Sequence, residues 1–175
     1  MLGRLAVAIV LMTANAWAQQ EEDTFAGQKA PEISKAEQTW INSAPLKLEQ
    51  LRGKVVLIEF WARECPFCAE AMPYVKALHE KYSADGLVVV GVHTPRADYE
   101  KDIPKVKEAV AEKGIKYPVV IDNDYAIWTD YLCAAWPSAY VVDQEGVIHL
   151  NHSGAGRYEE IEEVIQRLLK KNSAK

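Results

Sequence analysis

The sequence has little cysteine. Of three cysteines in 175 residues, only Cys65 and Cys68 are close together, three positions apart. One loop of this length constrains little of the unfolded chain, so the sequence is not that of a small scaffold held together by disulfides. A four-ligand zinc site usually needs a second pair of cysteine or histidine ligands at suitable spacing, and no such pair is present. The close pair therefore indicates redox chemistry, and no metal site is predicted.

Long basic runs and internal hydrophobic segments of membrane length are absent as well. Lysine and arginine total 20 against 25 acidic residues, and the only basic cluster is the short stretch at 170–175. This balance excludes nucleic acid as an expected partner. After the first 18 residues no apolar run is long enough to span a bilayer, so any membrane partner is expected to be a separate protein. The remaining composition, 49% hydrophobic, suits one globular domain with its own core.

The segment at 1–18 differs in character from the rest. Arg4 is followed by an apolar run at 5–12 and then by the small residues Ala16 and Ala18. This order is typical of a secretory signal peptide. We expect cleavage after Ala18, with a cut after Ala16 or an uncleaved anchor as alternatives. The expected location is therefore periplasmic or otherwise exported, with the protein soluble after cleavage.

The rest of the chain is predicted to contain a flexible lead-in at 19–35, a domain at 36–171 and a tail at 172–175. Within the domain, apolar runs alternate with segments of helical periodicity, and this order predicts a mixed α/β sheet flanked by helices on both faces. The predicted strands are 55–61, 87–93, 119–121, 139–142 and 147–152, the helices are 69–82, 103–113, 126–131 and 158–170, and a short edge hairpin is expected at 40–48.

The cysteine pair stands between a predicted buried strand and a predicted helix. Cys65 at the helix start would face unpaired backbone N–H groups and the positive end of the helix dipole, which lower the pKa of a thiol. Pro66 fits the first helical position, and Phe67 is expected on an exposed corner. We therefore predict an accessible Cys65 that attacks first. Cys68, one turn inward, is expected to be shielded and to resolve the mixed disulfide.

Glu59 is an acid in the middle of an otherwise apolar strand. Burial would raise its pKa, because a buried carboxylate is costly unless it is protonated or has a polar partner. Six residues before Cys65, it is predicted to lie beneath the disulfide and to exchange a proton with Cys68. The alternative is an edge residue that reaches solvent or pairs with a lysine.

Trp136-Pro137 precedes a predicted strand, a common place for a turn or a cis peptide bond. Cys133 stands four residues before Pro137, in an apolar helical turn. It is interpreted either as a packing residue or as a possible third thiol near the active centre.

Taken together, these features resemble the thioredoxin fold. The resemblance spans 40–169 and rests on the strand with its buried acid, on Phe60-Trp61-Ala62, on the quartet at 65–68, on Pro73 in the helix and on Trp136-Pro137. The segment at 94–117 is similar to the additional helix and strand of the TlpA/ResA group, which inserts them in the centre of the fold. Five stretches in order resemble the soluble redoxin domain of DipZ-like thiol–disulfide oxidoreductases: 51–57, 91–95, 122–126, 136–137 and 154–158.

The resemblance implies a cis peptide at Pro137 against the disulfide, and a Trp136 backbone that pairs with the chain of a protein disulfide substrate. It also implies an acid at Glu59 and re-reduction by a membrane electron carrier related to DsbD or CcdA. We expect no bound cofactor and a monomer. The chain departs from the group at Arg63-Glu64, where a tryptophan commonly precedes the first cysteine. It departs again at Ala71, where many members carry a glutamate.

The predicted function is therefore an exported thiol–disulfide oxidoreductase, acting as a protein-disulfide reductase by resemblance to its group. A thiol oxidase on the same fold is one alternative. A thiol peroxidase is a second, although it would want a threonine where the chain has Ala62. The third is a module that binds or delivers copper through the cysteine pair, although such modules commonly space their cysteines differently and need a histidine nearby.

Overall fold

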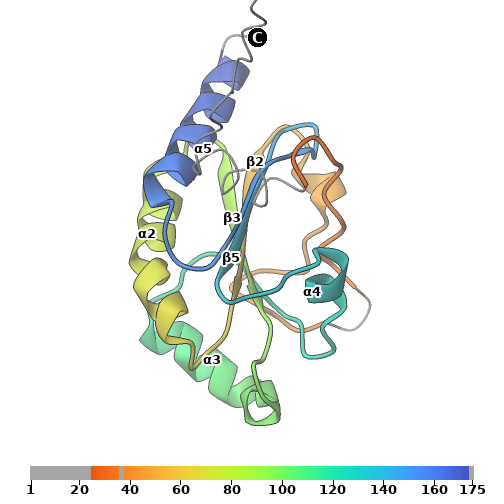
Figure 1. Ribbon diagram of the computed structural model, residues 1–175, viewed down its shortest axis with the longest axis vertical. Helices are drawn as coiled ribbons and strands as arrows, with labels where there is room; N and C mark the ends of the chain where they lie inside the picture. Colours follow the sequence, from red (N-terminus) through yellow and green to blue (C-terminus); the bar gives the residue numbers. More distant parts are fainter. Residues whose placement is uncertain (1–24, 36–37, 174–175) are drawn as a thin grey trace, which may run out of the picture.

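The computed structural model describes residues 25–35 and 38–173. In this part of the chain six strands form one mixed sheet in the order β1-β4-β3-β2-β5-β6 (Figure 1). The strands are β1 (Trp40–Ile41), β2 (Val55–Trp61), β3 (Leu87–His93), β4 (Val119–Ile121), β5 (Ser138–Val142) and β6 (Ile148–Ser153). The helices are η1 (Leu48–Leu51), α2 (Pro66–Tyr82), η2 (Asp98–Lys101), α3 (Ile103–Glu112), α4 (Ala126–Asp130) and α5 (Tyr158–Ser173). The predicted mixed α/β architecture is confirmed.

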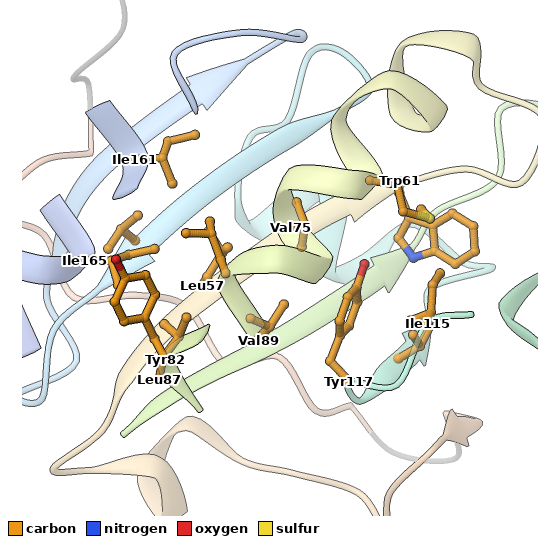
Figure 2. Packing of buried hydrophobic residues seen from close by; sticks show 14 of the residues in the cluster. Leu57, Trp61, Val75, Tyr82, Leu87, Val89, Ile115, Tyr117, Ile161 and Ile165 are labelled. Carbon is orange, nitrogen blue, oxygen red and sulfur yellow. The ribbon is translucent and has the colours of Figure 1, made fainter. Parts of the chain in front are cut away.

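The sheet separates two hydrophobic cores. Helices α2, α3 and α5 lie on one side and α4 on the other (Figure 1). Side chains of β2 alternate between the two sides, as the period of a strand requires. Leu57 and Trp61 pack under α2, α3 and α5, whereas Ile58 and Phe60 pack in the second core with α4. Figure 2 shows the first core, in which Val75 of α2 points toward the strands.

Strand β2 lies at the centre and carries the candidate site at its carboxyl end. It is parallel to β3 and antiparallel to β5. In this register Glu59 stands opposite Gly91 on one side and Ala139 on the other. All seven residues of β2 are buried, which explains its nearly continuous apolar sequence.

The helix after β2 begins at Pro66, the residue predicted for the first helical position, three residues before the periodic stretch at 69–82. Pro66 occupies the first turn, where its missing N–H costs nothing, and Cys65 is the N-cap residue. The expected extra helix and strand are α3 and β4. Helix α3 is capped by Asp102, whose carboxylate accepts the N–H of Lys105 at 3.2 Å. Strand β4 follows just after the segment at 94–117 that was expected to contain it.

The predicted edge hairpin at 40–48 is wrong. Strand β1 pairs antiparallel with β4, and Leu48–Leu51 form a 3-10 helix instead of a second strand. A two-stranded hairpin of such short strands is marginal by itself, whereas the edge of a formed sheet offers unpaired backbone groups. Asn42 stabilises this pairing, because its side-chain Nδ2 donates hydrogen bonds to the carbonyls of Ile115 and Tyr117, at 2.9 and 3.1 Å.

The described part of the predicted flexible lead-in is bound to the domain. The N–H of Gly27 donates to the carbonyl of Ile148 at 2.8 Å, and the N–H of Ala30 donates to the carbonyl of Gly146 at 3.0 Å. Ile33 is fully buried in the second core. Polarity suggested a free segment, but these backbone bonds and the burial of Ile33 attach it to the domain.

The described residues begin at residue 25 and end at residue 173. The predicted signal peptide at 1–18 and the first residues of the lead-in lie outside the described residues. Helix α5 extends to Ser173, past the predicted start of the tail at 172. Between residues 25 and 173, apart from 36 and 37, no helix has the length and apolar character that a bilayer crossing requires.

Candidate active site

Cys65 and Cys68 are joined in a disulfide at the beginning of α2, with their Cα atoms 5.2 Å apart. Cys65 has extended backbone angles, while Cys68 belongs to the first helical turn. The N–H of Cys68 donates to Sγ of Cys65 at 3.1 Å. After reduction the same N–H would point at a thiolate on Cys65, which the positive end of the helix dipole would also stabilise.

The two cysteines differ less in exposure than predicted. As residues, Cys65 is 4% and Cys68 is 1% exposed, so in the disulfide form both are buried. The exposed position is Phe67, between them, at 62%. Cys65 is the more exposed of the pair, but the expected contrast between an accessible and a shielded sulfur is small.

Glu59 is buried on the face of β2 that α2 covers, at 1% exposure. Burial raises its pKa from the ordinary 4.5 to about 8, although a hydrogen bond from Tyr117 acts in the opposite direction. Oη of Tyr117 donates to Oε2 of Glu59 at 3.2 Å. Oε1 is also buried and has no hydrogen-bond partner among the described residues. The site therefore favours a protonated carboxyl at neutral pH.

Gly91 makes room for the aromatic side chains around this carboxyl. A Cβ at this position would lie 3.1 Å from Nε1 of Trp61 and 3.2 Å from Cε2 of Tyr117. Both rings are fully buried and lie on the side of the sheet that α2 covers (Figure 2). The sequence analysis missed Tyr117, but a glycine within a strand of valines was a signal of close approach.

A cavity of about 240 Å³ lies between α2, α5 and the sheet, with Glu59 in its wall. Ala71, one turn after Cys68, and Pro137 line the same cavity. Ala71 is the position at which the chain departs from the wider group, and its small side chain occupies little of this space. The cavity is mainly apolar, and it connects the surroundings of Glu59 with the side of the site that carries Pro137.

Trp136 and Pro137 are joined by a cis peptide bond. Nε1 of Trp136 donates to the carbonyl of Thr94 at 2.9 Å, and its ring stacks on Trp128 with 4.0 Å between the ring centroids. The carbonyl of Pro137 accepts the N–H of Gly154 at 2.7 Å. Among the described residues, none bonds to the backbone N–H or C=O of Trp136.

Cys133 is not brought to the cysteine pair. It lies in the core on the opposite face of the sheet, beside Phe60 and Tyr140. Its Sγ is 3.6 Å from Oη of Tyr140, and burial raises its pKa to about 12. These surroundings are typical of a residue that packs in the core. Of the two interpretations that the sequence left open, the third thiol near the active centre has no support in this placement.

His149 and His152 lie in different surroundings. Nε2 of His149 lies 2.7 Å from Oδ2 of Asp143, whereas His152 lines the cavity beside Glu59. Within the residues whose placement the structure gives, no three side chains of histidine, cysteine, aspartate or glutamate are grouped to hold a metal ion.

Comparison with known proteins agrees with this geometry. The profile of the Redoxin family matches residues 25–165. The chain belongs to the Redoxin family. Thiol-disulfide oxidoreductase YkuV of Bacillus subtilis is 34% identical over 142 residues, which are 81% of this chain and 95% of YkuV. A solved thioredoxin-like protein in its oxidized form has a TM-score of 0.74 at 34% identity, covering 85% of this chain and 98% of that one.

Protein DipZ of Mycobacterium bovis is 42% identical over 139 residues, which are 78% of this Redoxin chain. The match covers 20% of DipZ, so the chain spans about a fifth of that relative's length. Together, the family, its relatives and the disulfide at the start of α2 agree on a thioredoxin-like fold that carries its cysteine pair at a helix start.

Proposed function

We propose that the protein is an exported reductase of protein disulfides. The observation that carries this proposal is the Cys65–Cys68 disulfide, with Cys65 as the N-cap of α2. In the reduced protein, the Cys65 thiolate attacks a disulfide of the partner, forms a mixed disulfide and releases one partner sulfur as a thiolate. Cys68 then attacks Sγ of Cys65, which frees the second partner sulfur and restores the Cys65–Cys68 disulfide. Two electrons have moved from this protein to the partner.

Glu59 serves in this proposal as the proton acceptor for Cys68. The resolving thiol must lose its proton before it attacks, and a neighbouring carboxylate can take that proton. With a pKa of about 8, most of the carboxyl is neutral at physiological pH, and the ionised minority can accept the proton. The cavity beside Glu59 supports the role, because it gives the carboxyl a path for exchange with solvent.

Trp136 and Pro137 form the proposed platform for the partner chain. The backbone groups of Trp136 have no bond within the described chain, so they can pair with an extended segment of the partner. Pro66 and Phe67 are both exposed beside the disulfide and would contact the partner on its other side. The substrate would thus lie between the start of α2 and the loop before β5.

A second partner must return electrons, because each turnover leaves the protein in its disulfide form. We propose a membrane electron carrier related to DsbD or CcdA, on the non-cytoplasmic side to which the predicted signal peptide would direct the protein. Its two thiols would reduce Cys65–Cys68 by the same exchange, run in the opposite direction. The chain is proposed to act as a monomer.

Trapping tests the assigned roles. The Cys68→Ala variant should accumulate partners bound to Cys65 through a disulfide, because the resolving step is lost, and mass spectrometry would identify them. The Cys65→Ala variant should trap none, and Cys133→Ala should behave as the unaltered protein. Trapping by Cys65→Ala instead would reverse the roles. Failure of the unaltered protein to reduce insulin or another test disulfide would contradict the proposed function itself.

A further inference from the structure

Glu100, in the short helix η2, reaches into the segment that carries the first cysteine. Its Oε1 accepts the backbone N–H of Glu64 at 2.7 Å, and its Oε2 accepts the backbone N–H of Arg96 at 2.6 Å. Glu64 is the residue immediately before Cys65. One carboxylate thus joins the loop after β2 to the loop after β3.

Two further contacts reinforce this junction. Nη1 of Arg96 donates to the carbonyl of Glu64 at 3.2 Å, and Nη2 of Arg63 donates to the carbonyl of Tyr99 at 3.4 Å. Both contacts are exposed, so each contributes little by itself. The peptide N–H and C=O of Glu64 are both held from the segment that contains η2. The residue on the amino side of Cys65 is therefore bonded at both its N–H and its C=O.

The burial of Glu100 is unusual for an acid in a surface loop. Its exposure is 0%, and an interior carboxylate is costly unless its oxygens are hydrogen bonded. Here each oxygen accepts a main-chain N–H, and such charge-assisted bonds are among the stronger ones in proteins. In the part of the chain with known placement, the N–H of Glu64 has no partner other than this carboxylate.

The N-cap geometry of Cys65 depends on how the chain enters the helix. Cys65 has φ −92° and ψ 112°, and its own N–H makes only a long bond of 3.4 Å to the carbonyl of Ala62. The shorter bond at the start of the helix is therefore one residue earlier, where the N–H of Glu64 donates to Glu100 at 2.7 Å. A nucleophile reacts fast only if it is held close to its line of attack, and small displacements are costly in rate.

We propose that Glu100 is a positioning residue for the nucleophile Cys65. It acts through the backbone of Glu64 and fixes the approach of the chain to the start of α2. The inference rests on the proposed function, in which Cys65 attacks the partner. It gives the segment between β3 and α3 a part in the reaction, exerted through the main chain of Glu64.

Glu100→Gln tests the proposal with little change of shape. The amide keeps one acceptor oxygen and presents an NH₂ group to the second main-chain N–H, so one of the two bonds is lost. We expect the saturating rate constant of a single turnover, with pre-reduced protein and an excess of a disulfide peptide, to fall about tenfold, with the half-saturating concentration unchanged. The amide signal of Glu64 in NMR spectra should shift, and its hydrogen exchange should accelerate.

Asp98→Asn is the matched control, because Asp98 lies in the same helix with an exposed carboxylate that pairs with Lys101. It should leave the rate constant and the Glu64 signal unchanged. Circular dichroism would verify that both variants are folded before the rates are compared. If folded Glu100→Gln reacts as fast as the unaltered protein, Glu100 has no positioning role. If the unaltered protein does not attack the peptide at all, the proposed function fails first, and the two failures are thus distinct.

Discussion

Glu59 has two small neighbours in the sheet and a tyrosine hydroxyl that donates a hydrogen bond to it. Opposite it in the sheet stand Gly91 and Ala139, and this leaves room for Tyr117 to reach Oε2. Neither hydrogen bonding nor a nearby cation lowers the pKa of the carboxyl to its ordinary range, because desolvation is the larger effect. A carboxyl in these surroundings takes up a proton on folding and can later release it.

This proton makes stability depend on pH. The folded protein keeps the carboxyl of Glu59 protonated up to about pH 8, whereas the unfolded chain loses that proton near the ordinary pKa of 4.5. Its contribution is fully present below the ordinary pKa and is lost as pH rises through the folded value. Between the two values, the free energy of unfolding falls by up to about 1.4 kcal/mol per pH unit.

Glu59→Gln should remove this dependence, because the amide is neutral at every pH. Urea unfolding of the disulfide form should show a variant that gains stability relative to the unaltered protein between about pH 5 and about pH 8. Glu49→Gln, at an exposed position, supplies the control and should show no such trend. A difference between Glu59→Gln and the unaltered protein that stays constant over this range would mean that Glu59 is charged in the fold.

The residues that could be predicted are those whose signal lies in their immediate sequence. Cys65 and Cys68 can be recognised by their spacing and by the strand before them, and Glu59 by its apolar neighbours. Tyr117 and Glu100 could not be found in this way. They stand 58 and 36 positions from the residues that they contact, and only the assembled sheet brings them together.

At the scale of elements, the strands of the sheet centre were predicted because each has a long run of buried side chains. The attachment of the N-terminal segment and the partner of β1 were not. Strand β1 has two residues, and its partner β4 is about 80 positions later in the chain, with Trp40 opposite Val120. Short segments of this kind gain their structure from the surface on which they lie, and local sequence carries little information about that surface.

Ile33 provides a test of how firmly the N-terminal segment is held. Its side chain is fully buried in the second core, so Ile33→Ala should lower the free energy of unfolding by about 2–4 kcal/mol. Leu132→Ala removes a comparable apolar group at a position that is 68% exposed, and it should change stability by less than about 0.5 kcal/mol. Urea unfolding of both variants gives the comparison. Equal, small effects would restore the expectation of a flexible lead-in.

At the scale of the whole molecule, reducing power and stability are linked. Oxidation of the cysteine pair and unfolding of the chain form a closed thermodynamic cycle. The reduction potential of the cysteine pair differs between the folded and the unfolded chain. The free-energy equivalent of that difference is the difference in unfolding free energy between the disulfide and dithiol forms. For two electrons, about 30 mV corresponds to about 1.4 kcal/mol. A strong oxidant has a folded state that stabilises its dithiol form, and a reductant has one that stabilises its disulfide form.

The proposed direction therefore predicts that the disulfide form of this protein is the more stable one. Urea unfolding of the oxidised protein, and of the protein held reduced by excess dithiol, should differ by at least about 1.4 kcal/mol in favour of the disulfide form. A variant with serine at both Cys65 and Cys68 should not respond to the reductant, which controls for effects on the rest of the chain. Greater stability of the dithiol form would instead make the protein an oxidant. The same two sulfurs would still carry out the exchange, but electrons would pass from the partner to Cys65–Cys68.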